Sequence, residues 1–293
     1  TAKVRLGVVA AAGSDRVTWM DLGDDPEQYL ARVQWMPDGS LTAQVEDRAQ
    51  TRLSLLRLDP KTGTSSVILT ESSDVWINLH DLLRPIDDGP LAGHFVWASE
   101  RSGFRHLYLY NGAGELVRPL TAGPWHVDAV PEIDGPRGIV YFLANREHPT
   151  EQQLYSVWLT GGEPRRITPE PGTHGVVIDH ALRRFVDVHS STAAPPRLTL
   201  RSLDDGAVLR EIPHEPDPRL ADLELRPPEL RSFENRHGDT LHAAIYRPDS
   251  AIRPYPTLVE IYGGPHAQRV VNAWGSTVDM RARRQRPHQR LSL

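Results

Sequence analysis

Apolar residues occupy every second position along several short segments of the chain, and a tight polar turn interrupts each of these segments. Alternation with a period of two is typical of a β-strand with one buried face. Asp, Asn or Gly between two such runs is typical of a hairpin turn. Four segments share this layout and close on Thr or Pro: residues 53–70, 107–121, 154–168 and 198–213. They predict four β-hairpins.

A further candidate strand precedes each hairpin, so that every unit offers three or four short strands. These runs are residues 40–47, 93–100, 138–145 and 183–190. Successive hairpins close 45 to 51 residues apart, which is the period of a β-propeller blade. A similar partial unit, at residues 15–23 and 31–40, opens the chain. We therefore expect a mainly β protein with a partial β-propeller of four to five blades over residues 1–225. A β-sandwich with coincidentally even spacing is the alternative.

The pattern changes after Pro213. Residues 214–230 are rich in Pro and acidic side chains, which is typical of a linker. The stretch 231–248 carries a His-Gly-Asp turn between two candidate strands, and 256–264 holds the nearly continuous apolar run LVEIY. Such a run is expected of a strand that is buried on both faces of a mostly parallel sheet. Residues 226–280 are therefore predicted to contain the first strands of an α/β domain.

Composition narrows the classes of function. The 293 residues include no cysteine, which excludes disulfides, thiolate chemistry and cysteine-bound zinc. The 13 His residues are scattered and form no metal-binding motif, so we expect no metal and no other cofactor. A net charge of −5 gives no indication of a nucleic-acid partner, and no apolar run is long enough to span a membrane. Without a recognisable signal peptide we expect a cytoplasmic protein; the periplasm is the alternative if an N-terminal signal has been lost.

The candidate for chemistry is Tyr262, which ends the apolar run and precedes two glycines. The last side chain of a strand at the carboxyl edge of a parallel sheet faces the crevice where α/β enzymes bind ligands. A phenol held there can donate a hydrogen bond to the oxyanion that forms when a nucleophile attacks a carbonyl. Such a donor is worth about 3–4 kcal/mol in the transition state. A strand-end Tyr with its hydroxyl in solvent is the alternative.

The segments WINLHD, SERSGFRHLYLY, HGDTLHAAIYRP and YGGPHAQ, in this order along the chain, resemble the dipeptidyl peptidase IV branch of the prolyl oligopeptidase family of serine peptidases. The likeness extends to about Ser276. It implies a β-propeller, usually of eight blades, followed by an α/β-hydrolase domain. It also implies an enzyme that removes dipeptides from peptide N-termini when Pro or Ala is the second residue. The resemblance assigns the oxyanion-hole hydrogen bond to Tyr262, implies a peptide substrate, and leaves open a homodimer of the intact parent.

The same resemblance places the segment WINLHD near the substrate pocket, where His80 and Asp81 could contact the peptide. Both differ from the aromatic and basic residues of better-known members, and a His and an Asp in a loop more often cap a turn. In the next segment, Arg101 and Arg105 are expected to make a structural ion pair or turn contact with Glu100 rather than to bind a ligand.

Two features of the family are missing from the sequence. The catalytic Ser of an α/β-hydrolase lies in G-x-S-x-G and is followed by Asp and His, and no G-x-S-x-G occurs in the 293 residues. The family's paired glutamates, which hold the free amine of the substrate, have no counterpart because the chain contains no Glu-Glu. Residues 281–293 form an aberrant basic tail, which we interpret as truncation by a shift of reading frame; a short basic binding tail is the alternative.

We therefore expect most of the propeller and the first hydrolase strands of a serine-type dipeptidyl peptidase, with no peptidase activity in this chain. Three alternatives stay open. They are a non-catalytic propeller that binds a partner, another peptidase of the prolyl oligopeptidase clan, and a remnant that scarcely folds because an incomplete propeller leaves strand edges open.

Overall fold

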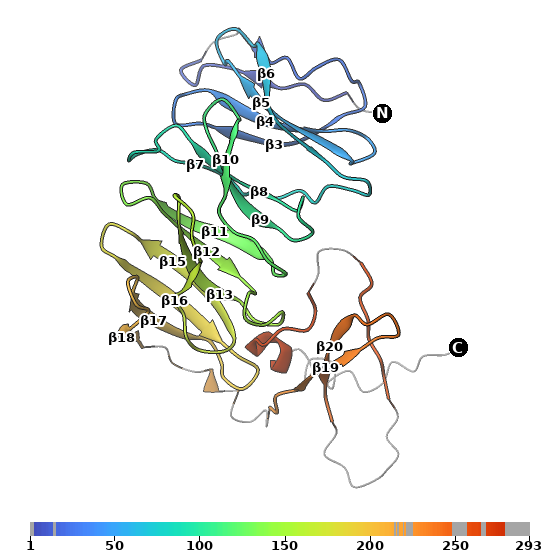
Figure 1. Ribbon diagram of the computed structural model, residues 1–293, viewed down its shortest axis with the longest axis vertical. Helices are drawn as coiled ribbons and strands as arrows, with labels where there is room; N and C mark the ends of the chain where they lie inside the picture. Colours follow the sequence, from blue (N-terminus) through green and yellow to red (C-terminus); the bar gives the residue numbers. More distant parts are fainter. Residues whose placement is uncertain are drawn as a thin grey trace. The chain divides into compact units, whose positions relative to one another are not determined.

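The computed structural model describes residues 3–13, 16–213, 215, 217–218, 220, 225–247, 257–264 and 268–278. The chain forms two compact units, one of Thr1–Phe142 with Ser156–Arg165 and one of Leu143–Tyr155 with Arg166–Leu293. Nearly all of the regular structure in the described residues is β-strand (Figure 1).

Four antiparallel sheets of four strands make up most of the described chain. The first sheet contains β3 (Tyr29–Trp35), β4 (Leu41–Glu46), β5 (Arg52–Leu58) and β6 (Ser65–Ser72). The second contains β7 (Leu83–Pro85), β8 (Phe95–Ser99), β9 (His106–Tyr110) and β10 (Leu116–Pro119). The third contains β11 (Val127–Asp134), β12 (Ile139–Ala144), β13 (Gln153–Trp158) and β14 (Arg165–Arg166). The fourth contains β15 (Thr173–Asp179), β16 (Arg184–Ser190), β17 (Arg197–Ser202) and β18 (Val208–Ile212).

In every one of these sheets the strands lie side by side in the order in which they occur along the chain. A four-stranded meander wound from one contiguous stretch is the unit of a propeller blade. The partial β-propeller predicted from the sequence is therefore confirmed, and so are the four hairpins and the strand before each of them. Alternation identified these strands because it depends only on which face of the local chain is buried.

The opening strands of the later blades, β7, β11 and β15, carry no clear alternation. β7 has only three residues, and β11 contains Pro131, which is tolerated because β11 lies at the edge of its sheet. The partial unit predicted at the start of the chain divides differently from the prediction. There β1 (Gly7–Val8) pairs with β2 (Thr18–Trp19), whereas β3 opens the first four-stranded sheet.

The core between the first two sheets follows from the alternation. Leu53 and Leu55 of β5 belong to one apolar cluster with Phe95 and Trp97 of β8, and none of these four residues is more than 1% exposed. The rings of Phe95 and its cross-strand partner Tyr110 stack with centroids 5.3 Å apart. Each side chain of this size contributes about 1.5–3 kcal/mol through burial, so the cluster holds the two sheets together.

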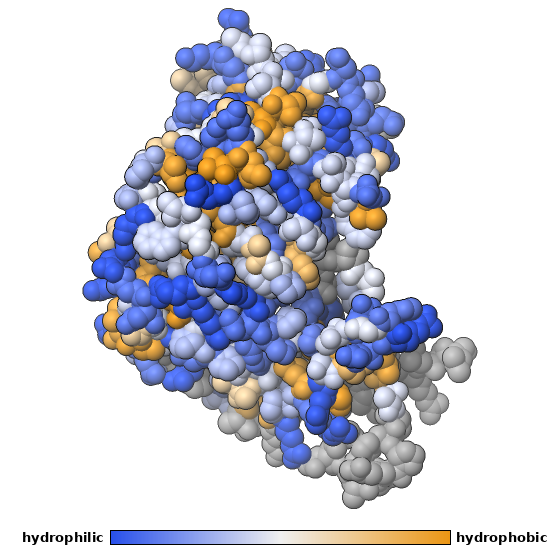
Figure 2. All heavy atoms as spheres, viewed as in Figure 1, coloured by the Kyte–Doolittle hydropathy of each residue, from blue (hydrophilic) through white to orange (hydrophobic). Residues whose placement is uncertain are grey.

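Apolar side chains also reach the surface over β10 and β18, the last strands of the second and fourth sheets (Figure 2). Leu116 and Val117 of β10 are 49% and 40% exposed, and Val208 and Leu209 of β18 are 48% and 51% exposed. Strands at the edge of a sheet have fewer neighbours to cover them, and scattered exposed apolar residues of this kind are ordinary in folded proteins.

Beyond the fourth sheet, β19 (Glu229–Glu234) and β20 (Thr240–Ile245) form an antiparallel hairpin. Its turn is the His-Gly-Asp sequence. Gly238 has a φ of +85°, which Gly adopts without steric cost, and Asn235 Oδ1 accepts hydrogen bonds from the amides of His237 and Asp239. The two strands predicted around this turn are confirmed.

The prediction of a strand at 256–264 is wrong, because the described residues 257–264 form no strand. Leu258 and Ile261 are 88% and 85% exposed. An apolar run becomes a buried strand only where neighbouring strands satisfy its edges and cover its faces, and no sheet of the described residues includes this run. Further along, residues 274–278 form a short helical segment.

The predicted domain boundaries stay predictions. Residues 221–224, beside the boundary at 225, lie outside the described residues, and so does the whole predicted tail at 281–293. Within the part of the chain that the structure describes, no helix is long and apolar enough to cross a membrane.

Candidate functional site

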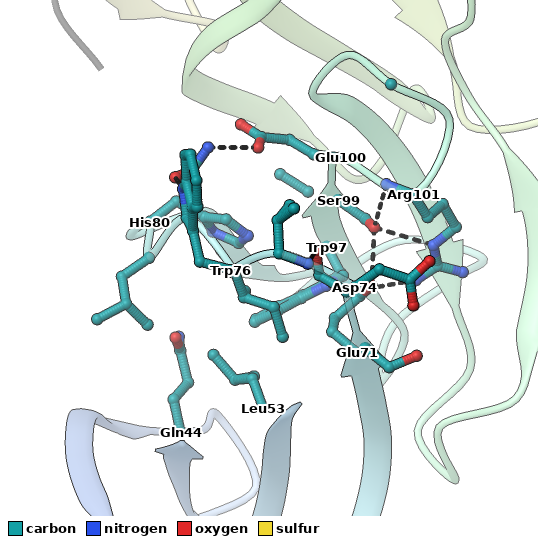
Figure 3. A pocket seen from close by; sticks show the side chains of 18 residues that line it. Gln44, Leu53, Glu71, Asp74, Trp76, His80, Trp97, Ser99, Glu100 and Arg101 are labelled. Carbon is teal, nitrogen blue, oxygen red and sulfur yellow. Dashed lines mark hydrogen bonds and ion pairs between the residues drawn. The ribbon is translucent and has the colours of Figure 1, made fainter. Parts of the chain in front are cut away.

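A cavity of about 600 Å³ opens beside the segment that connects the first sheet to the second. This connection, residues 73–80, forms much of the wall (Figure 3). Gln44 and Leu53 enter from β4 and β5, and the other walls come from β6, β8 and the turn after β8. The cavity therefore lies between two neighbouring blades, beside the segment of chain that connects them.

One wall of the cavity is a network of hydrogen bonds and an ion pair centred on the Glu71 carboxylate. The Glu71 carboxylate accepts hydrogen bonds from Trp97 Nε1 at 2.9 Å and from Ser99 Oγ at 2.9 Å, and it forms an ion pair with Arg101. Arg101 in turn donates to the Tyr110 hydroxyl at 2.7 Å. Although burial lowers the pKa of Arg101, the Glu71 carboxylate and the Tyr110 hydroxyl raise it above its ordinary value. Arg101 is thus a fixed cation that is already paired.

A second chain of polar contacts ends at Glu100. Trp76 Nε1 donates to Asn78 Oδ1 at 2.7 Å, and Asn78 Nδ2 donates to Glu100 Oε2 at 2.5 Å. Arg105 contacts the other carboxylate oxygen of Glu100 at 3.4 Å. The ion pair predicted for Glu100 is therefore present with Arg105, whereas Arg101 pairs with Glu71 instead.

His80 lines the cavity and is half-buried. Its ring lies tilted against the Trp97 indole with centroids 4.6 Å apart, and its Nδ1 accepts a hydrogen bond from the Leu82 amide at 3.1 Å. Burial lowers the pKa of His80 to about 4, and the Arg105 cation acts in the same direction. His80 is therefore neutral near pH 7. The contact with Leu82 is the turn cap considered as an alternative, and the role of His80 in substrate binding stays a prediction.

Asp81 does not line the cavity. Its side chain is 75% exposed and forms an ion pair with Arg32 of β3. The two residues predicted to contact a peptide are thus adjacent in sequence but differ in surroundings: His80 borders the cavity, while the Asp81 carboxylate is paired with an arginine. A substrate contact by Asp81 stays a prediction.

Tyr262 belongs to the second unit, in the stretch 257–264, and is 54% exposed. The Arg269 guanidinium lies 6.0 Å from the centroid of its ring. A β-carbon at Gly264 would lie 2.7 Å from the Tyr262 hydroxyl, so the ring in this orientation lies directly against the glycine. Pro265, which follows, lies outside the described residues. The phenol is accessible to a ligand, and its oxyanion role stays a prediction.

Among the residues that line the cavity, the sequence identified His80 as a candidate for binding, and Glu100 and Arg101 only as members of a structural ion pair or turn contact. Glu71 is 26 residues from Trp97 and 30 from Arg101, and such contacts depend on which strands become neighbours. Gln44 occurs in an alternating strand pattern and gives no separate signal. Among the described residues, no three His, Asp or Glu side chains gather closely enough to hold a metal ion.

Comparisons with known proteins agree with this fold. The family model for the dipeptidyl peptidase IV (DPP IV) N-terminal region matches residues 1–196. The chain is 28% identical to human dipeptidyl peptidase 8, an alignment that covers 84% of this chain and 34% of that protein. It is 27% identical to mouse dipeptidyl peptidase 8, over 91% of this chain and 36% of that protein.

Among solved structures, dipeptidyl peptidase 4 of Porphyromonas gingivalis superposes with a TM-score of 0.81 at 22% identity, covering 95% of this chain and 40% of that one. At this level of identity the superposition shows that the fold is shared. The chain spans about a third of the length of the curated relatives it matches.

Proposed function

We propose, from the premise that this chain belongs to the dipeptidyl peptidase IV N-terminal region family, that it supplies the propeller of a serine-type dipeptidyl peptidase. The observation that carries the proposal is the family match over residues 1–196, a range that contains three of the four-stranded meanders and the first two strands of the fourth. In the intact parent, the enzyme would release N-terminal dipeptides in which Pro or Ala is the second residue.

Tyr262 is the residue of this chain that we place next to the reacting atoms. Attack on the peptide carbonyl creates an oxyanion, and a phenol donates a hydrogen bond to it more strongly than to the neutral carbonyl. The exposed ring of Tyr262 and the small glycines beside it are compatible with such an approach. His80 and Asp81 are proposed to contact the peptide away from the scissile bond.

We expect no turnover by the 293-residue chain alone, because it contains no G-x-S-x-G to supply a nucleophile. Gly-Pro and Ala-Pro chromogenic amides test this directly. Turnover that a serine-directed phosphonate abolishes would contradict the expectation. Any longer product of the same gene should cleave these amides, and N-acetylation of the substrate should stop cleavage. Cleavage that survives N-acetylation would instead indicate another peptidase of the prolyl oligopeptidase clan.

The second candidate is a non-catalytic propeller that binds a partner, which the open cavity beside residues 73–80 would allow. A stoichiometric partner in a pull-down, together with no cleavage by any product of the gene, would favour it.

We also propose a cytoplasmic location, with the periplasm as the alternative, and cell fractionation distinguishes them. Sedimentation of the intact parent tests for a homodimer.

A further inference from the structure

The charged side chains that line the cavity are predominantly acidic. Glu71, Asp74 and Glu100 supply three carboxylates, and Arg101 supplies the one guanidinium of the lining. Arg101 is committed to Glu71, and Arg105, which is not part of the lining, contacts one oxygen of Glu100. His80 adds no positive charge near pH 7, because burial lowers its pKa to about 4. The cavity consequently presents a negative field to a ligand.

Aromatic and aliphatic surfaces accompany these carboxylates. Trp76 is 50% exposed, and the Trp97 indole and the side chains of Ile77 and Leu79 also line the cavity. Carboxylates combined with indole faces suit a cation on an apolar stem, since the stem packs against the rings and the charge is attracted to the ring faces.

The strand that reaches the cavity from the first sheet, β4, carries a buried acceptor that no donor of the described residues reaches. Gln44 is 4% exposed, lines the cavity, and its Oε1 is buried with no hydrogen-bond partner among the described residues. Figure 3 shows its amide end directed from β4 toward the cavity. A buried acceptor of this kind is costly unless a donor reaches it, so it indicates a ligand rich in N–H groups.

We propose that this cavity binds a primary alkylammonium group of the kind carried by a lysine side chain. An ammonium offers three donors and no acceptor, so it can donate to the unpaired oxygen of Gln44, while the carboxylates of the lining supply the negative field that attracts it. The alkyl stem lies against Trp76 and Trp97. The assignment rests on the proposed function only in naming a peptide as the carrier of the ammonium; the ligand chemistry follows from the cavity.

Titration of the 293-residue chain with small amides tests the assignment by calorimetry or NMR. Nα-acetyl-lysine methylamide is expected to bind at least about tenfold more tightly than Nα-acetyl-norleucine methylamide, which has nearly the same stem without the charge. Added salt should weaken only the charged ligand. Equal binding of the two, or tighter binding of Nα-acetyl-glutamate methylamide, would overturn the proposal.

A third probe separates the two peptide sources of an ammonium. Norleucine methylamide with a free α-amine carries its charge where a peptide N-terminus would. Weaker binding of this probe than of the lysine probe supports a lysine side chain as the ligand. Equal or tighter binding overturns that assignment, because the recognised group is then the chain terminus.

Variants locate the site. Asp74→Asn changes an exposed residue and should leave the fold intact, and Gln44→Leu removes the unpaired acceptor; each is expected to weaken lysine binding by about three- to tenfold. Glu27→Gln, at an exposed position outside the cavity, should not change binding and is the matched control. Unchanged binding in both Asp74→Asn and Gln44→Leu would overturn the assignment. Because none of these measurements requires turnover, their failure would leave the peptidase proposal standing.

Discussion

At the scale of single residues, the cavity is defined by groups whose chemistry depends on burial. The clearest case is His80, whose ring lies tilted against Trp97 and whose Nδ1 accepts a hydrogen bond from the Leu82 amide. A histidine in such surroundings resists protonation, whereas the same residue in the unfolded chain does not.

Acid should therefore destabilise the protein through His80. Its pKa is about 4 in the folded chain against 6.5 ordinarily, so between these values the unfolded chain binds a proton that the folded chain does not. The stabilising contribution is complete above pH 6.5 and is lost as pH falls toward 4, with a slope of at most about 1.4 kcal/mol per pH unit. His80→Gln should flatten this part of a denaturation series over pH. His237→Gln, at an exposed turn, should not, and an equal flattening by both variants would contradict the explanation.

At the scale of elements, the glycines of the hairpin turns differ in how much room their neighbours leave for a side chain. Gly114 lies in the turn between β9 and β10 with a φ of +86°, and a β-carbon there would lie 1.8 Å from the carbonyl oxygen of Ile68 in β6. Gly138 has a similar φ of +69°, but nothing lies within 4 Å of its missing β-carbon.

These two glycines form a matched pair for mutation. Gly138→Ala is expected to cost about 1–2 kcal/mol of unfolding free energy, from the backbone conformation alone. Gly114→Ala should cost about 1–3 kcal/mol more, because the backbone of β6 must also move. Urea denaturation of both variants measures the difference. Equal costs would show that the turn can move away from β6 without penalty.

The fourth sheet contains a buried ionic network. Asp187, which is fully buried, contacts Nδ1 of His174 at 2.9 Å and Nε of Arg201 at 2.9 Å, and Arg201 reaches Glu170 at 2.8 Å. Removing one member of such a network leaves the other charges buried and incompletely paired.

Asp187→Asn is therefore expected to lower the free energy of unfolding by about 3–5 kcal/mol. The same sheet offers a control in the exposed pair of Arg197 and Glu211, where Arg197→Gln should cost less than about 1 kcal/mol. Thermal or urea melts of both variants test the contrast. A similar loss of unfolding free energy in the two variants would mean that burial does not determine how much an ion pair contributes to stability.

The sequence predicts elements better than it predicts the cavity, for a physical reason. The hairpin at 53–70 is recognisable because the alternation of β5 and its polar turn are local properties. The network around Glu71 joins β6 to β8 and needs two sheets to come together first. The apolar run at 258–262 misled the prediction, since a pattern of side chains reports what a segment would bury and not whether neighbours are there to cover it.

At the scale of the whole molecule, the segment around Asn272 is tied to loops that lie far away in the sequence. Asn272 Nδ2 donates to Glu151 at 2.9 Å, and its Oδ1 accepts from the Thr192 amide at 3.0 Å. The Asn272 amide donates to the Thr150 carbonyl at 2.7 Å, and the Thr277 hydroxyl donates to the Thr192 carbonyl at 2.6 Å. Asn272 thus connects residues 268–278 to the loop between β12 and β13 and to the loop between β16 and β17.

Asn272→Ala should release this segment while leaving the sheets intact. Two or three lost hydrogen bonds at about 1 kcal/mol each correspond to hydrogen exchange about 30- to 160-fold faster at the Thr192 amide and in residues 271–278. Gln268→Ala is the control, since the Gln268 side chain donates its hydrogen bond within the segment, to the Val270 carbonyl. Unchanged protection at Thr192 in the Asn272 variant would show that the backbone contact alone is sufficient.

The sequential order of strands within each sheet has a consequence for how such a protein can change. Among the sheets that the structure describes, none borrows a strand from another, so a cut or an insertion between two of them interrupts no hydrogen-bond ladder in either. Each four-stranded sheet can then be gained, lost or exchanged as a single uninterrupted piece of gene. What must be re-formed afterwards is the packing of its two faces against the neighbouring sheets.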